Sequence, residues 1–318
     1  MRAAQRIVVT GAAGFIGEPL CRGLRHSPAL AHDGAELIAT DRANLVGAIG
    51  VVLGDIGDPA LIEKLFERPV HRMFHLAGIV SGRAETDFAL GKHVNLDATL
   101  ALLERCREQA QRGGSVVRFV YASSIAVFGT PLPERIDDTT QPLPTLSYGT
   151  HKRVIELLID DYSRRGFIDG RALRLSGVLP RPALPNGALS AFNSDLIREP
   201  LAGRDYVCPV GPDATLWLTT LRSTLHNLMS LADIDPRELG AQRGLTAPVL
   251  AVRVGDIVAA LARIDPEAPA RVTYQPQASL EAQFGRWPLN CSFARAQALG
   301  LRVEENIGAL LETCVACL

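Results

Sequence analysis

Residues 7–17 read IVVTGAAGFIG, and this stretch predicts the fold of the N-terminal half of the chain. The apolar, β-branched run before the first glycine is typical of a strand that is buried on both faces. A glycine turn follows at once, and a helical pattern then continues to Leu24. The stretch therefore predicts a strand, a tight turn and a helix, which is the unit that begins a doubly wound parallel sheet.

Each of the three glycines has a mechanical role in this unit. Gly11 allows the chain to turn sharply off the strand, and Gly14 lets the backbone approach a pyrophosphate. Gly17 lets the helix lie close on the strand, and Phe15 and Ile16 belong to the first helical residues, where free N–H groups favour phosphate. The spacing GxxGxxG is one residue wider than the common fingerprint, and a plain tight turn is the alternative. We expect these five residues to bind a dinucleotide.

Acidic residues after the second and third predicted strands indicate which dinucleotide. Asp41 lies where a carboxylate meets the adenosine ribose, and it would repel a 2′-phosphate, so we expect NAD rather than NADP. The neighbouring Arg42 could serve a phosphate, although a solvent-facing arginine is the simpler interpretation. Asp55 and Ile56 are expected at the adenine edge, with a capping acid in a loop as the alternative.

Size and composition exclude several classes of protein. The chain has 318 residues, of which 47% are hydrophobic and 21% charged, which is typical of a globular protein with a main domain and a smaller lobe. The net charge of −1 argues against nucleic-acid and anionic-membrane surfaces. No signal peptide and no apolar segment of about 18 residues is visible, so we expect a cytoplasmic protein.

The six cysteines are scattered, as in a reduced cytosolic enzyme. Cys314 and Cys317 form a CxxC near the C-terminus, without a second pair or a nearby histidine. We interpret them as buried thiols of a terminal helix and predict no metal site.

Strand and helix patterns alternate along the first half of the chain. This alternation predicts a parallel sheet with right-handed crossovers. Strands are expected at 35–40, 51–53, 73–76, 116–121 and 171–175, and helices from 58, at 86–110 and at 148–162. Further helices are expected at 188–201, 221–232 and 254–264. We predict an α/β Rossmann domain over 1–175, and over 176–318 mainly a smaller substrate-binding lobe, with some segments returning to the sheet.

The motif YxxxK at Tyr148 and Lys152 carries the predicted chemistry. Residues four apart stand on one face of a helix, so the lysine ammonium lies near the phenol. The ammonium and an oxidised nicotinamide both lower the pKa of the tyrosine from about 10, so that it can accept a proton from an alcohol. The motif follows a strand that ends in the serine pair Ser123 and Ser124, whose hydroxyl can reach the same substrate oxygen. A serine-rich turn is the alternative.

With these motifs the sequence resembles the extended short-chain dehydrogenases/reductases, also described as the NAD-dependent epimerase/dehydratase family. The resemblance covers residues 5 to about 180. It is carried by the segments TGAAGFIG at 10–17, HLAG at 75–78, Val94-Asn95, Ser123-Ser124 with Val127-Phe128-Gly129, and Tyr148 with Lys152.

The resemblance implies roles for individual residues. Ser124, Tyr148 and Lys152 would be the catalytic trio, and Ser124 is chosen over Ser123 because the family's reactive hydroxyl immediately precedes the x-x-Val-aromatic-Gly run. The cofactor would also be contacted by Leu76, Ala77, Gly78, Asn95, Tyr148 and Lys152. The family also suggests a homodimer that uses the helix bearing Tyr148 and the long helix before it.

The two residues after Ser124 narrow the class of reaction. Family members that dehydrate sugar nucleotides carry an Asp-Glu pair there, whereas this chain has Ile125 and Ala126, which cannot move protons. The second half resembles the branch of the family that oxidises the hydroxyl beside the carboxylate of small sugar acids such as D-erythronate, on the segments Pro185-Asn186-Gly187 and 197–203. For the substrate we expect Ser124 and Tyr148 together with Ser81, Asn186, Arg198, Trp217 and Arg222.

We therefore expect NAD-dependent oxidation of a secondary hydroxyl of a sugar acid to a 2-oxo acid. Arg174, Arg198 and Arg222 are candidates for the substrate carboxylate, and for each a structural ion pair is the alternative. A sugar-nucleotide epimerase is the second hypothesis. A non-catalytic cofactor sensor is the third, although such proteins tend to lose the tyrosine or the lysine.

Overall fold

The computed structural model describes residues 5–27, 30, 35–45, 50–182 and 191–317. The chain divides into two compact units. The first comprises 1–127, 146–174 and 228–245, and the second comprises 128–145, 175–227 and 246–318. The first unit is therefore made of three separate segments, and the chain returns to it twice after passing through the second unit.

The first unit is built on a seven-stranded sheet with the order β11-β7-β5-β4-β1-β2-β3. β1 (Arg6–Thr10) lies near its centre, all five of its residues are buried, and it pairs in parallel with β2 and β4. The order reverses between β1 and β4, and ligands of open α/β sheets bind at the carboxyl ends of strands at such a point. The predicted Rossmann fold is confirmed. The other strands are β2 (Glu36–Asp41), β3 (Val51–Leu53), β4 (Arg72–His75), β5 (Val117–Ser124), β7 (Ile168–Leu175) and β11 (Gly244–Thr246).

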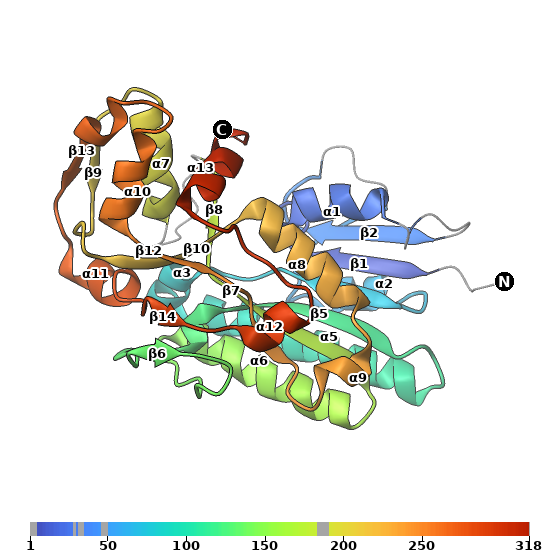
Figure 1. The fold of residues 1–318 in the computed structure, drawn as a ribbon. Helices are drawn as coiled ribbons and strands as arrows, with labels where there is room; N and C mark the ends of the chain where they lie inside the picture. Colours follow the sequence, from blue (N-terminus) through green and yellow to red (C-terminus); the bar gives the residue numbers. More distant parts are fainter. Residues whose placement is uncertain (1–4, 28–29, 31–34, 46–49, 183–190, 318) are drawn as a thin grey trace. The chain divides into compact units, whose positions relative to one another are not determined.

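Helices cover both faces of this sheet (Figure 1). One face carries α1, and α2, α5 and α6 lie on the other. As predicted, the second of these helices begins at an Asp-Pro pair, where the Asp58 side chain accepts a hydrogen bond from the N–H of Ala60. The helices of this unit are α1 (Gly17–Arg25), α2 (Pro59–Leu65), α3 (Ser81–Thr86), α4 (Phe88–Lys92), α5 (Ala98–Gln111), α6 (Ser147–Arg164) and α9 (Pro236–Leu239), and α8 (Leu221–Asp233) enters it from the second unit.

The single helix predicted over 86–110 is interrupted. Between α4 and α5, His93–Asp97 form one π-helical turn, in which Asn95 is buried. Such turns insert an extra residue into the helical repeat and are frequent at functional sites. Apolar periodicity could not predict the turn, because the pattern is intact on both sides of it.

The core of the first unit lies between the sheet and the helices α2, α5 and α6. It contains Val8, Met73 and Phe119 from the strands, packed with Leu102 of α5 and Ile155 of α6. This core fixes α6 against β5, and these two elements carry the predicted catalytic residues.

The second unit contains a three-stranded sheet, β12-β10-β8, and two two-stranded sheets, β13-β9 and β14-β6. Its own core includes Leu216, Val254 and Leu310. Its strands are β6 (Arg135–Ile136), β8 (Gly177–Leu179), β9 (Tyr206–Cys208), β10 (Thr215–Thr220), β12 (Leu250–Arg253), β13 (Val272–Tyr274) and β14 (Asn290–Cys291). Its helices are α7 (Phe192–Leu201), α10 (Val254–Leu261), α11 (Ala278–Phe284), α12 (Ala294–Ala298) and α13 (Ile307–Val315), with a short 3₁₀ turn at Ala268–Arg271. Another 3₁₀ turn, Ile125–Val127, follows β5 in the first unit.

The C-terminal cysteines differ from each other. Cys314 is buried in α13 as predicted, whereas Cys317 is exposed beyond the end of that helix, so the expectation of two buried thiols is wrong for the second. Within the described residues no helix is long and apolar enough to cross a bilayer.

Candidate active site

The glycine turn after β1 is shaped by close backbone approaches. Gly11 has a φ of +69°, and a Cβ on it would lie 2.6 Å from the N atom of Ala77, after β4. A Cβ on Gly17 would lie 2.0 Å from the carbonyl oxygen of Gly11, so only glycine lets α1 start this close to the strand. Gly14 is exposed, and among the described residues beyond its chain neighbours its would-be Cβ meets the Gly11 oxygen alone, at 3.1 Å. Its outer side is therefore open to a ligand.

The start of α1 offers hydrogen-bond donors beside this open side. The N-cap residue is Ile16, and no side chain caps the helix. The N–H of Glu18 donates to the carbonyl oxygen of Gly14 at 3.1 Å and Pro19 has no N–H, so within the described residues the N–H groups of Ile16 and Gly17 are the ones left for another acceptor. Phe15 and Ile16 are both half-buried. A diphosphate fits these donors and the positive end of the helix dipole.

Asp41 stands at the end of β2, next to the glycine turn. Its Oδ2 accepts a hydrogen bond from the N–H of Ala13 at 3.0 Å, and its Oδ1 accepts one from the N–H of Ala43 at 3.1 Å. A carboxylate has about four acceptor positions, so two remain for ribose hydroxyls. The residues here fit the adenosine half of NAD.

The loop after β3 has a different arrangement. Asp55 accepts a hydrogen bond from the N–H of Gly57 at 2.9 Å and forms an exposed ion pair with Arg42, with 3.7 Å between Oδ2 and Nε. Arg42 is thus paired with an acid of the protein. Ile56 is buried in the core of the first unit, so its side chain supports the loop. Contact of Asp55 and Ile56 with adenine stays a prediction.

A buried polar chain joins the ends of β1 and β4 to the helix beyond. His75 contacts the hydroxyl of Thr10 through Nδ1 at 2.6 Å and the hydroxyl of Thr99 through Nε2 at 2.8 Å. Burial, with a smaller effect of the Lys152 charge, lowers the pKa of His75 to about 3, so the ring is neutral. No motif in the sequence predicts a role for this network. The one sequence feature that could indicate it is His75, a histidine at the end of an apolar strand.

The loop after β4 is held by Asn95 of the π-helical turn. The Asn95 amide accepts a hydrogen bond from the N–H of Ile79 at 2.7 Å and donates one to the Ile79 carbonyl at 3.0 Å. A Cβ on Gly78 would lie 3.1 Å from Asn95 Oδ1 and 3.7 Å from Lys152 Nζ. Asn95, Gly78 and Lys152 therefore converge, and Leu76 and Ala77 precede them in the same half-buried loop.

The serine pair ends β5, and its two members face different surroundings. Ser123 is buried, and its hydroxyl donates to Glu156 Oε1 at 2.6 Å. Ser124 is half-buried, and its Oγ accepts a hydrogen bond from the N–H of Ala126 at 3.1 Å. Because the Ser123 hydroxyl is buried and bonded to Glu156, this arrangement favours Ser124 as the serine that contacts a substrate.

Tyr148 and Lys152 lie on α6, one turn apart. Lys152 is buried, and its Nζ donates to the carbonyl oxygen of Ala122 at 2.7 Å. The ammonium lies 5.6 Å from the ring centroid of Tyr148 and 4.5 Å from that of Tyr121. Burial lowers the pKa of Lys152 to about 7, while the charge of Glu156 acts in the opposite direction. A cation so placed next to a phenol favours its phenolate form.

Tyr121 is a second phenol in this cluster, which the sequence analysis did not single out. It is fully buried, and among the described residues its hydroxyl finds no hydrogen-bond partner. Burial raises its pKa well above the ordinary value, and the charges of Tyr148 and Glu156 act in the same direction. Tyr121 therefore stays protonated and offers Lys152 a ring face.

The predicted substrate residues are spread over both units. Ser81 is the first residue of α3 in the first unit and is half-buried. Asn186 lies outside the described residues. In the second unit, Arg198 is paired with Asp195 and Glu199, and Trp217 is 1% exposed with its indole N–H bound to the carbonyl of Pro288 at 2.8 Å.

The three candidate arginines differ in their partners. Arg174 forms a bidentate ion pair with Glu156 in the first unit, and Arg198 has the two acids named above. Arg222 is exposed and forms no ion pair with any described residue. Of the three, only Arg222 has a guanidinium that no acid of the described chain engages.

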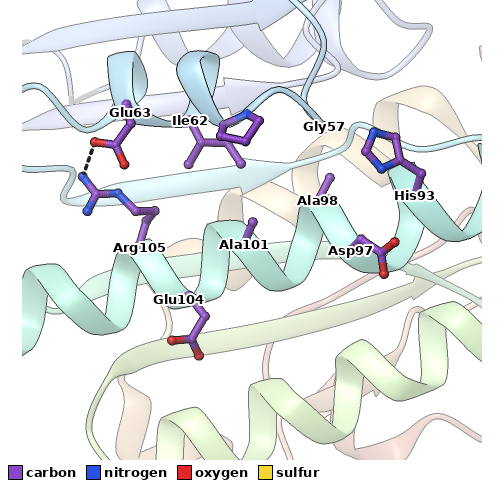
Figure 2. Close-up of a pocket in the computed structure, with 10 residues that line it drawn as sticks. Gly57, Ile62, Glu63, His93, Asp97, Ala98, Ala101, Glu104 and Arg105 are labelled. Carbon is purple, nitrogen blue, oxygen red and sulfur yellow. Dashed lines mark hydrogen bonds and ion pairs between the residues drawn. The ribbon is translucent and has the colours of Figure 1, made fainter.

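A separate cavity of about 300 Å³ lies between α2 and α5 (Figure 2). His93 and Asp97 of the π-helical turn border it at one end, and an ion pair between Arg105 and Glu63 spans the two helices at 3.1 Å. Its lining residues include none of the predicted catalytic or cofactor residues.

Comparison with known proteins agrees with this geometry. A model of the NAD dependent epimerase/dehydratase family matches residues 7–216. D-erythronate dehydrogenase of Cupriavidus necator is 40% identical over 316 residues, which are 96% of this chain and 96% of that protein. D-erythronate dehydrogenase of Haemophilus influenzae is 33% identical over 313 residues, which are 96% of this chain and 98% of that protein.

A solved structure is similar over the same length. The crystal structure of a nucleoside-diphosphate-sugar epimerase from Agrobacterium tumefaciens matches with a TM-score of 0.90 and 36% identity, over 98% of this chain and 94% of that one. The glycine turn, the uncapped helix start and the lysine beside the tyrosine thus occur in a chain that matches the model of an NAD-dependent family. The chain belongs to the NAD-dependent epimerase/dehydratase family of extended short-chain dehydrogenases/reductases and is an NAD-dependent oxidoreductase.

Proposed function

We propose that the protein oxidises the hydroxyl next to the carboxylate of a small sugar acid, of the D-erythronate class, to give a 2-oxo acid. Two relatives named for this activity support the proposal, because each is similar over nearly the whole of both chains. The observation that carries the chemistry is the buried Lys152 ammonium, bonded to Ala122 at the end of β5 and 5.6 Å from the ring of Tyr148.

Three side chains would together remove the proton of the substrate hydroxyl and stabilise the charges that result. Tyr148, as phenolate, removes the proton of the substrate hydroxyl. Ser124 donates a hydrogen bond to the same oxygen, which becomes a carbonyl oxygen. Lys152 stabilises the charge of Tyr148 and holds the nicotinamide ribose. When NAD is bound, its nicotinamide ring supplies the acceptor for the hydride that leaves the substrate carbon.

The remaining cofactor residues would act by binding. The N–H groups of Ile16 and Gly17 at the start of α1 and the open side of Gly14 would hold the diphosphate, and Asp41 would hold the adenosine ribose. Leu76, Ala77 and Gly78 would line the groove, which Asn95 braces from behind. Asp55 and Ile56 would border the adenine.

For the substrate carboxylate we propose Arg222, since Arg174 and Arg198 are already engaged by acids. A guanidinium fork binds a carboxylate through two parallel hydrogen bonds. Ser81, Asn186, Arg198 and Trp217 remain predicted substrate contacts, and Trp217 could offer only apolar surface because its N–H is occupied.

The homodimer and the cytoplasmic location also remain predictions. In support of the dimer, α5 and α6 each expose an apolar side chain, with Leu100 37% and Leu157 52% exposed. Analytical ultracentrifugation of the wild type and of Leu157→Asp would test this surface.

A sugar-nucleotide epimerase is the second candidate, favoured by the described activity of the Agrobacterium tumefaciens protein. An epimerase returns the hydride to its substrate, so it releases no NADH. A dehydrogenase gives stoichiometric NADH.

The experiment is a panel of four- and five-carbon aldonic acids and nucleotide sugars, each with NAD and with NADP, read by NADH absorbance. We expect NADH with an aldonic acid and NAD. Tyr148→Phe should lower turnover by about 10²–10⁴-fold while NAD still binds.

Tyr121→Phe is the matched control, because it removes the other phenol hydroxyl under Lys152, one that has no partner in the described structure. This variant should keep most of the activity. Epimerised nucleotide sugar without NADH, or a fully active Tyr148→Phe variant, would contradict the proposal.

A further inference from the structure

The catalytic helix carries a buried acid one turn beyond Lys152. Glu156 of α6 has no exposed surface. Its carboxylate accepts hydrogen bonds from Ser123 of β5 at 2.6 Å, from Arg153 at 3.1 Å, and from Arg174 of β7 at 2.9 Å and 2.8 Å. Three elements of the first unit therefore meet at one side chain.

Consecutive turns of α6 hold consecutive residues of β5. Lys152 bonds the carbonyl of Ala122, and Glu156 bonds the hydroxyl of Ser123. Side chains alternate along a strand, so a Ser123 hydroxyl fixed toward α6 commits the next side chain, Ser124, to the other direction.

Glu156 also supplies negative charge beside Lys152. The groups that face this ammonium are Tyr121 of β5, His75 of β4, and Tyr148, His151 and Glu156 of α6. The two histidines are neutral near pH 7, because burial lowers the pKa of each. Glu156 is the only carboxylic acid in this set.

Burial alone would make Lys152 give up its proton too readily. Burial lowers the pKa of Lys152 from 10.5 to about 7, and the Glu156 charge raises it against this effect. Arg153 and Arg174 donate hydrogen bonds to the carboxylate of Glu156, so this buried acid has two cationic partners.

We infer that Glu156 is a positioning residue of the reaction: it holds Lys152 in the ammonium form and orients the serine pair at the end of β5. The inference rests on the proposed Ser-Tyr-Lys reaction. Glu156 touches neither substrate nor cofactor in this role; it acts through Lys152 and Ser123.

The chain contains only three lysines, Lys64, Lys92 and Lys152, which makes the charge of Lys152 directly measurable. Lysine labelled with ¹³C at Cε gives one NMR signal for each, and Lys152→Met assigns the third. We expect Lys152 in the wild type to titrate near neutral pH. In Glu156→Gln its midpoint should fall by about one pH unit or more, while those of Lys64 and Lys92 stay.

Further variants separate positioning from folding. Glu156→Gln leaves Arg153 and Arg174 without their acid. The double variant Glu156→Gln/Arg174→Gln removes both members of the central ion pair, and because the positive charge of Arg174 is lost as well, the Lys152 midpoint should fall by less than in Glu156→Gln. Asp160→Asn is the matched control: Asp160 lies one turn further on α6, bonds the N–H of Arg243 at 2.7 Å, and should leave Lys152 unchanged.

The pH dependence of enzyme activity is the second measurement. In both Glu156 variants the alkaline limb of the pH–rate profile should move to lower pH, because Lys152 loses its proton earlier, while KM for NAD changes little. Ser123→Ala should lower kcat without moving that limb, because the Lys152–Glu156 charge interaction remains. Glu156→Asp should restore part of the profile.

The outcomes distinguish the two hypotheses. If no sugar acid yields NADH but the Lys152 midpoint falls in Glu156→Gln, the proposed function fails and the electrostatic role of Glu156 stands. If Lys152 titrates at the same pH in the wild type and in both Glu156 variants, the inference is overturned, whatever the substrate.

Discussion

The glycine turn after β1 and the Lys152 cluster (Lys152, Tyr148, Tyr121, Ser123 and Glu156) lie in the same unit but are built in opposite ways. In the turn, backbone meets backbone, and the informative quantities are the distances of 2.6 Å and 2.0 Å at which a Cβ would collide. In the cluster, buried charges meet, and the informative quantities are polar contacts of 2.6–2.9 Å. A substitution in the turn should therefore change stability or cofactor affinity, whereas one in the cluster should change turnover and its pH dependence.

Lys152→Met should have the largest effect. Removing the ammonium should lower kcat/KM by about 10²–10⁴-fold, because the phenolate loses its stabilising charge. Since the folded-state pKa of Lys152 is lowered, the unfolded chain binds more protons between about pH 7 and pH 10.5, and this group makes stability rise with pH in that window.

Urea unfolding across this window should show that rise weakened in Lys152→Met relative to the wild type. Lys92→Met, which removes an exposed lysine paired with Asp97, is the control and should change neither property. Equal pH slopes in all three proteins would show that Lys152 is not desolvated as described.

Within the turn, Gly17→Ala and Gly14→Ala should separate folding from binding. A Cβ at residue 17 meets backbone at 2.0 Å, so we expect a loss of about 3 kcal/mol in the free energy of unfolding. A Cβ at residue 14 meets the Gly11 carbonyl oxygen at 3.1 Å and no other described atom beyond its chain neighbours, so stability should fall less than in Gly17→Ala while NAD affinity falls. Urea denaturation measures the stability of both variants, and NAD titration measures their affinity for the cofactor. If Gly14→Ala binds NAD as tightly as the wild type, the diphosphate does not lie against Gly14.

His75→Gln tests the polar chain that joins the turn to the cluster. The pKa of His75 is lowered to about 3, so below about pH 6.5 this histidine binds a proton in the unfolded chain but not in the folded chain. Stability therefore decreases as the pH is lowered from about 6.5. Between pH 7 and pH 5 this group should cost the wild type about 2 kcal/mol, and His75→Gln should lack that part of the loss. His26→Gln, at an exposed position, should keep the wild-type slope.

Asp41→Asn should have the smallest effect. The amide keeps an acceptor for Ala13 but loses the charge that favours ribose hydroxyls and repels a 2′-phosphate, so KM for NAD should rise about tenfold and the preference over NADP should shrink. Asp55→Asn breaks only an exposed ion pair with Arg42 and serves as the control. Initial rates with NAD and with NADP give the ratio of the two kcat/KM values, which measures the cofactor preference.

The same contrast explains how much the sequence could predict. The turn is local: one stretch of eleven residues contains the strand, the glycines and the helix start, and its geometry agrees with the pattern. The strands at 51–53 and the helix around Tyr148 also follow their periodicity, with ends shifted by at most a few residues.

The cluster depends on contacts that no local pattern shows. On a helix, the pattern of Lys152 and Glu156 is typical of a solvent-exposed ion pair. Glu156 is buried because Ser123 of β5 and Arg174 of β7, both distant in the sequence, pack against it. The π-helical turn that places Asn95 keeps the apolar pattern intact. The short strands β6 and β11 were not predicted, because neither carries an apolar run like that of β3 at 51–53.

The division of the chain has a practical consequence for engineering. The sequence suggests a cut near residue 175, but β11, the neighbour of β7 in the large sheet, comes only at Gly244–Thr246. A fragment that ends at 175 would leave β7 as a bare edge with unpaired N–H and C=O groups, ready to recruit another copy. Split-protein designs should therefore break the chain within a surface loop of a single unit and keep both halves present during refolding.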